Sequence, residues 1–109
     1  MEREEGCLFC QIVKGKIDAE IVYEDEFTIA FRDINPKAKV HVLVVPKSHT
    51  RDMNSFSKLD DLSISRIIQS IPEVADKLGI GEGYRVQSNC GRGGGQEVFH
   101  LHFHLMSGS

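Results

Sequence analysis

The segment Phe99-His100-Leu101-His102-Phe103-His104-Leu105-Met106 alternates apolar and imidazole side chains with a period of two. Successive side chains of a β-strand point to opposite faces of the sheet. The pattern therefore predicts a strand over 100–106, with three histidines on one face and an apolar face of Phe99, Leu101, Phe103 and Leu105 in the core. Same-face neighbours on a strand lie roughly 6–7 Å apart, so one phosphoryl group can contact two imidazoles.

This segment holds three of the five histidines in the chain. A solvated strand face is usually built from Thr, Lys or Glu, and a purification tag would not interleave large apolar residues so regularly. A metal site made of all three imidazoles is disfavoured, because alternate side chains on a strand run parallel instead of converging. We interpret the three histidines as a functional constellation.

Four other stretches, rich in β-branched or aromatic residues and bounded by turn formers, are expected to be strands: 20–24, 27–33, 39–45 and 84–89. The short interval 24–26 fits a hairpin, which favours antiparallel neighbours.

One long helix is expected between the third and fourth of these stretches, where apolar residues recur at helical spacing: Leu59, Leu62, Ile67, Ile71, Val74 and Leu78. Ser57 with Asp60 resembles a capping pair, and Gly79 fits a C-terminal stop. Pro72 predicts a kink or a break into two helices. Exposed apolar positions on this helix would favour a homodimer.

A short helix is expected over 9–14, ended by Gly15. The expected fold class is therefore α+β: a five-stranded antiparallel sheet, one long helix kinked by proline that covers one face of it, and a short N-terminal helix.

The composition fits a single domain, 1–109, because 40% of its 109 residues are hydrophobic. A net charge of -3 argues against binding a nucleic acid polymer, which needs clustered Lys and Arg. The charged N-terminus lacks a signal sequence and the longest aliphatic run is 42–45, so we expect a cytoplasmic protein without membrane association. The three cysteines are expected to be free thiols or metal ligands.

The chain closely resembles the histidine-triad family, whose signature of three alternating histidines and two apolar residues is matched by 100–106. The resemblance extends over 7–10, 23–25, 31–34 and 41–49 and through the glycine-rich run that leads into the triad. It implies a homodimer that joins two sheets into ten strands, and no organic cofactor. It also implies hydrolysis of nucleoside phosphoramidates or other nucleotidyl substrates, releasing a purine nucleoside monophosphate of AMP or GMP type.

The resemblance assigns His102 as the nucleophile that forms a covalent nucleotidyl intermediate. His104 would contact the phosphate as a donor, while His100 and His41 would support and orient from behind. A neutral imidazole, with a reference pKa of about 6.5, is a competent nucleophile at physiological pH.

The resemblance also implies which residues contact the nucleotide, with walls for the base and a partner for the ribose hydroxyls at Asp33. The implied set is Phe9, Ile12, Ile17, Asp33, Ile34, Asn89, Gly95, Glu97, Val98, His102 and His104. Two other interpretations stay open: Asp33 can be a turn former that caps its own backbone, and the apolar residues can be core residues.

Residues 91–95 form a glycine cluster that follows a predicted strand, and its amides can approach a phosphate closely. We interpret it as a phosphate cradle, although many glycine clusters are only connections. Arg92 can add positive charge or be solvated. Glu97 stands where the phosphoramidase branch of the family commonly has a serine, and an ionised carboxylate repels phosphate.

Cys7-x-x-Cys10 has the spacing of two thiolates on one tetrahedral metal. His49 and His100 are candidates for the other two ligands, as in some relatives, and we expect structural zinc. The alternative is a reduced cysteine pair packed in the first helix. Two other functions stay open: a dinucleoside-polyphosphate hydrolase, and a zinc-stabilised nucleotide-binding module with little turnover.

Overall fold

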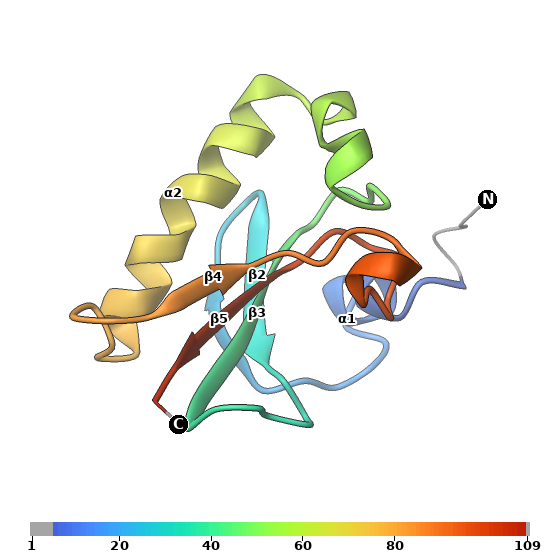
Figure 1. Ribbon diagram of the computed structural model, residues 1–109. Helices are drawn as coiled ribbons and strands as arrows, with labels where there is room; N and C mark the ends of the chain where they lie inside the picture. The colour runs from blue at the N-terminus through green and yellow to red at the C-terminus, as the bar shows by residue number, and fades with distance from the viewer. Residues whose placement is uncertain (1–5, 109) are drawn as a thin grey trace.

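The computed structural model describes residues 6–108 and contains one five-stranded sheet (Figure 1). The strands are β1 (Ile21–Glu24), β2 (Thr28–Arg32), β3 (Val40–Pro46), β4 (Arg85–Gln87) and β5 (Phe103–Ser107). Their order across the sheet is β1-β2-β3-β5-β4, and every pairing is antiparallel. The helices are α1 (Leu8–Val13) and α2 (Asp61–Lys77), with short 3-10 helices at Met53–Lys58 and Arg92–Gly94. The predicted α+β class is confirmed.

The turn between β1 and β2 is the short hairpin expected from the sequence. Asp25 Oδ1 accepts hydrogen bonds from the backbone amides of Phe27 and Thr28, both at 2.8 Å. The carboxylate closes the turn by satisfying amides that no strand partner reaches.

The long helix α2 starts one turn later than Ser57 would place it. Ser57 lies in the preceding 3-10 helix, and the residue that caps α2 is Asp60, whose side chain accepts from the amide of Ser63 at 2.7 Å. Of the kink or break expected at Pro72, the break does not occur, because α2 runs as one helix from Asp61 to Lys77. Pro72 and Ile68 both lie on the exposed side of the helix. Because proline has no N–H, the Ile68 carbonyl lacks its helical hydrogen-bond donor, and solvent can donate to this carbonyl instead.

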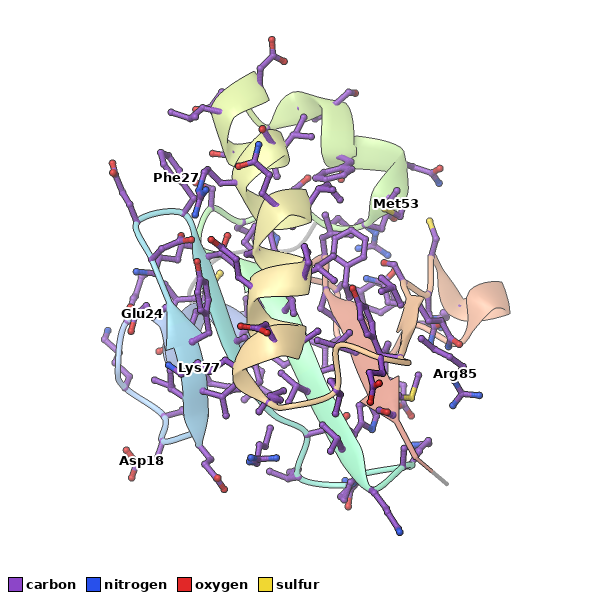
Figure 2. The ribbon with its side chains drawn as sticks, turned by 90° about the vertical axis from the view of Figure 1, so that its left-hand side faces the viewer. Asp18, Glu24, Phe27, Met53, Lys77 and Arg85 are labelled. Carbon is purple, nitrogen blue, oxygen red and sulfur yellow. The ribbon has the colours of Figure 1, made fainter. Side chains whose placement is uncertain are left out.

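The two faces of the sheet carry separate apolar clusters. Val42, Val44, Phe103 and Leu105 pack with the inner face of α2 in one cluster. Leu43, Val45, Ile29 and Phe31 form the other, together with α1 residues. Figure 2 shows α2 in front of the sheet, with Glu24 of β1 and Arg85 of β4 at opposite edges. The period-two pattern thus divides the triad segment as predicted: Leu101, Phe103 and Leu105 are buried on the α2 side.

The strand predicted over 100–106 is shorter than expected, because β5 begins at Phe103. Val44 pairs with Phe103, so the same register would place Leu101 opposite Pro46, which has no N–H for the ladder. The Leu101 amide donates to the Thr50 carbonyl at 2.7 Å instead. Phe99 also departs from the prediction, since it is only half-buried and lies under the Arg51 guanidinium, 4.2 Å from its ring centre.

No helix within residues 6–108 has the length and apolar character needed to cross a bilayer. Two apolar side chains of α2, Leu62 and Ile68, are 57% and 48% exposed. They favour the expected homodimer, which stays a prediction.

Candidate active site

Three neighbouring strands bring Asp33, His41 and His104 to the face of the sheet that α1 covers. The Asp33 amide donates to the His41 carbonyl at 3.0 Å, which continues the β2–β3 pairing by one residue. Leu43 pairs with His104 across β3 and β5. Paired residues and alternate residues of a strand share a face, so these polar groups converge although 63 residues separate His41 from His104.

His41 and His104 form a hydrogen-bonded relay whose direction is set by a backbone group. The Lys37 amide donates to His41 Nδ1 at 3.0 Å, so the proton of the neutral ring lies on Nε2. His41 Nε2 is 2.9 Å from His104 Nδ1 and therefore donates to it. The relay leaves His104 with a protonated Nε2, which is a hydrogen-bond donor.

His102 has the opposite polarity. Its Nδ1 lies 2.8 Å from the His100 carbonyl, which can only accept, so Nδ1 carries the proton and Nε2 carries the lone pair. The Phe9 ring stands edge-on to His102 at 5.1 Å between centres. The ring centres of His102 and His104 are 5.0 Å apart, which places an imidazole lone pair beside a hydrogen-bond donor.

A cavity of about 580 Å³ opens in front of His102 and His104. All eleven residues expected to contact a nucleotide line it: Phe9, Ile12, Ile17, Asp33, Ile34, Asn89, Gly95, Glu97, Val98, His102 and His104. His41 and His100 do not line it, but His41 contacts His104 and the His100 carbonyl contacts His102. Cavities of this size accommodate small-molecule ligands.

Both interpretations of Asp33 fit the geometry. Its Oδ1 accepts from the Asn35 amide at 2.8 Å, as a turn former does, while its Oδ2 lies 3.5 Å from His41 Nε2. The carboxylate nevertheless lines the cavity. The apolar lining residues differ in burial. Phe9 and Ile12 are core residues that also line the cavity, whereas Ile34 is 90% exposed and is not part of the core.

The glycine-rich turn has a different role from the one expected. The amides of Gly94 and Gln96 donate to the Gly91 carbonyl, the Gly95 amide donates to the Arg92 carbonyl, and the Gly91 amide donates to Gln96 Oε1. These four amides are used inside the turn and are not free to cradle a phosphate. Only Gly95 of this cluster lines the cavity, and Arg92 does not.

Sequence reasoning missed nine cavity residues: Leu8, Asp18, Ala19, Phe31, Arg32, Asn35, Lys37, Leu43 and Gln87. The period-two pattern could have identified Phe31 and Leu43. Phe31 lies two positions before Asp33, and Leu43 lies two positions after His41, each pair on a predicted strand and therefore on one face. The others come from loops and from the first or last residue of a helix or strand, where the sequence carries little periodic signal.

Burial keeps these imidazoles neutral. Loss of solvation lowers the pKa of His104 to about 4, an effect reinforced by the neighbouring His102 and His41. Burial also lowers the pKa values of His102 and His41, against a partial opposing effect of Asp33. At neutral pH the lone pair of His102 is therefore free.

We expect acid to destabilise the fold through His104. Because its pKa is about 4 in the folded chain and about 6.5 when unfolded, the unfolded state binds more protons between these values. The free energy of unfolding should therefore fall as the pH drops through this window, by about 2 kcal/mol between pH 7 and pH 5. Urea unfolding of metal-free protein at several pH values measures it. In His104→Gln, the free energy of unfolding should change less steeply with pH. The same pH dependence in wild type and variant would contradict the assignment of this effect to His104.

A second cluster lies behind the triad, where α1 meets the loop after β3. It consists of Cys7, Cys10, His49 and His100, whose ligand atoms all lie within 4.8 Å of one another. Cys7 Sγ and Cys10 Sγ are 3.2 and 3.4 Å from His100 Nδ1, and the two histidine Nδ1 atoms are 3.1 Å apart. Ligand atoms around a tetrahedral zinc are separated by about 3.3 to 3.8 Å, so these four residues fit that ion.

The tautomer of His100 suits a metal ligand. Its Nε2 lies 2.8 Å from the Pro46 carbonyl and donates to it, which leaves the Nδ1 lone pair facing the thiols and His49. Burial lowers the pKa of His100 to about 4, so the ring is neutral. The same residue contacts both clusters, because its carbonyl accepts from His102.

Known proteins resemble this chain over almost its full length. A purine nucleoside phosphoramidase from Escherichia coli is 39% identical over 105 residues, covering 95% of this chain and 88% of that protein. A HIT family hydrolase from Clostridium thermocellum is 44% identical with a TM-score of 0.87, covering 96% and 92%. A histidine triad protein from Clostridium difficile is 42% identical with a TM-score of 0.86, covering 100% and 95%. The HIT domain family model matches residues 14–109. The chain belongs to the HIT family.

Proposed function

We propose that this protein hydrolyses nucleoside phosphoramidates or other nucleotidyl substrates and releases a purine nucleoside monophosphate. One observation carries the proposal: backbone partners leave His102 Nε2 with a lone pair and His104 Nε2 with a proton, side by side at one cavity. The likeness to a purine nucleoside phosphoramidase supports the choice of substrate class.

In the first step, the lone pair of His102 Nε2 attacks the phosphorus and forms a P–N bond to the ring. The bond from phosphorus to the leaving group breaks, and the leaving group departs with the electron pair and takes a proton from water. His104 Nε2–H donates to a non-bridging oxygen, where negative charge grows. The positive charge that develops on the His102 ring is stabilised by the Nδ1–H bond to the His100 carbonyl, 2.8 Å away.

In the second step, water attacks the phosphorus of the nucleotidyl-histidine. The bond to His102 breaks, its electron pair returns to Nε2, and the water loses a proton to solvent. The sum of the two steps is the substrate plus water giving a nucleoside monophosphate and the free leaving group. His102 returns to the tautomer with which it began.

The nucleoside would occupy the apolar half of the cavity. Phe9, Ile12 and Val98 line this half, with Ile17 and the exposed Ile34 at its rim. Asp33 would accept from the ribose hydroxyls, because its Oδ2 is not used by the turn that holds Oδ1. Flat apolar walls with one acceptor suit a nucleoside of AMP or GMP type.

We also propose that Cys7, Cys10, His49 and His100 hold a structural zinc ion. The ion would tie α1 to the segment that precedes β5 and would supply no chemistry to the reaction, because all four protein ligands close the site. Orientation of His102 would come from the carbonyl of one of these residues, His100. Cys7, Cys10 and Cys90 are not joined by a disulfide, so both thiols of the cluster are available as ligands.

Incubation with an adenosine phosphoramidate and with diadenosine polyphosphates tests the reaction. We expect AMP to be released from the phosphoramidate with a higher kcat/KM than from the diadenosine polyphosphates. Chromatography of the products measures the released AMP. Faster release from the polyphosphates would favour the dinucleoside-polyphosphate hydrolase. Release from neither, with AMP still bound, would leave only a binding module.

A further inference from the structure

Glu97 adds a carboxylate to the lining of the cavity. Its exposed side chain lines the cavity with Gln87, Asn89 and Gly95. The amide groups here contact one another, with Gln87 Nε2 donating to Asn89 Oδ1 at 2.9 Å and Asn89 Nδ2 to the Gly95 carbonyl at 3.5 Å. Within residues 6–108, Glu97 has no hydrogen bond or ion pair, so its charge is free to act on a ligand.

The backbone on both sides of Glu97 is firmly held. Gln96 is 4% exposed, and its side chain accepts from the Gly91 amide at 2.8 Å. The same amide side chain donates to the carbonyls of Arg51 and Val98, at 2.8 and 3.0 Å. Val98 packs against the apolar cluster under α1. The glycine-rich turn therefore fixes the backbone from which this carboxylate projects.

Because Glu97 lines the same cavity as the two reacting histidines, its carboxylate can act on the leaving group. With the nucleoside in the apolar half and phosphorus at His102 Nε2, the leaving group departs roughly opposite the attacking nitrogen. Outside the apolar walls the lining is polar, and Glu97 is part of it. A charge on the leaving group would then share the cavity with the Glu97 carboxylate, and two unit charges in one cavity attract or repel each other.

We propose that Glu97 is a specificity-determining residue that selects substrates by the charge of the leaving group. The carboxylate favours a leaving group that carries an ammonium and disfavours one that carries carboxylate or further phosphates. The inference rests on the proposed hydrolase function and adds a substrate class to it: nucleotidyl conjugates of cationic amines.

Three adenosine phosphoramidates of similar length test the inference: conjugates of putrescine, butylamine and γ-aminobutyrate, whose far ends are positive, neutral and negative. We expect kcat/KM to fall in that order. In Glu97→Gln, the ratio between the putrescine and γ-aminobutyrate conjugates should shrink by about tenfold at low salt and by less at high salt. A change in the pKa of His102 would affect all three substrates alike and cancels in the ratio.

Glu82→Gln is the matched control, because it removes the same charge from an exposed glutamate that does not line the cavity. It should leave the ratio unchanged. Binding of the three conjugates to a His102→Gly background, measured by calorimetry, separates the two proposals. If wild type hydrolyses none of them but Glu97→Gln still shifts the relative Kd values, the hydrolase function fails and the charge selection stands. Ratios of kcat/KM and Kd within twofold of wild type in Glu97→Gln overturn the charge selection.

Discussion

Replacing His102 by glycine is expected to lower kcat by about ten-thousandfold or more, while AMP still binds with a Kd within about threefold of wild type. The substitution removes the imidazole lone pair that faces the cavity, and His104 cannot replace it because its Nδ1 is occupied by His41. The apolar walls and Asp33 stay in place, so the nucleoside keeps its contacts. Single-turnover hydrolysis of an adenosine phosphoramidate and calorimetry with AMP measure the two quantities.

His104→Gln is the graded comparison, because its amide still offers a donor to the phosphate while the relay from His41 is lost. We expect a smaller drop, about one hundredfold, and a nucleotidyl-enzyme that can still be trapped by rapid acid quench. In His102→Gly no such adduct should form. A near-normal rate in His102→Gly would remove the nucleotidyl-histidine pathway altogether.

The triad segment shows what a period-two pattern can predict, the buried face of a strand, and what it cannot, the residue at which the strand begins. It assigned Leu101, Phe103 and Leu105 to the core and the histidines to the other face, because burial on one side is a strong local constraint. It misplaced the start of β5, since the ladder ends where Pro46 lacks a donor on a strand far away in the sequence. The boundary of a strand depends on its partner.

The relay between His41 and His104 could not be derived from either local sequence. Its direction depends on the Lys37 amide, a loop group four residues from His41, and on a register that joins residues 63 apart. The interpretation of the glycine cluster as a phosphate cradle does not hold, for a similar reason. Glycines permit amides to face a ligand, but here Gln96 and the turn itself use them. Composition indicates what a backbone allows, whereas the hydrogen-bond partners decide what it does.

Removal of the metal is expected to lower the melting temperature by about 15 °C or more. The proposed zinc joins Cys7 and Cys10 at the start of α1 to His49 and His100, so its loss frees the N-terminal segment and leaves buried thiols and imidazoles without an ion. A shift of this size corresponds to a few kcal/mol of unfolding free energy for a domain of this length. Thermal unfolding with and without a chelator, together with metal analysis, measures it.

Cys90→Ser is the matched control for Cys10→Ser, because Cys90 is the third cysteine and lies outside the cluster. Cys10→Ser should lose the bound zinc and reproduce the melting temperature of the chelated protein, while Cys90→Ser keeps one zinc per chain. Because the His100 carbonyl orients His102, kcat should fall with zinc loss even below the melting temperature, whereas KM for the nucleotide should change little. A zinc-free wild type whose melting temperature does not respond to chelator would show that the two thiols are only a reduced pair packed against the imidazoles.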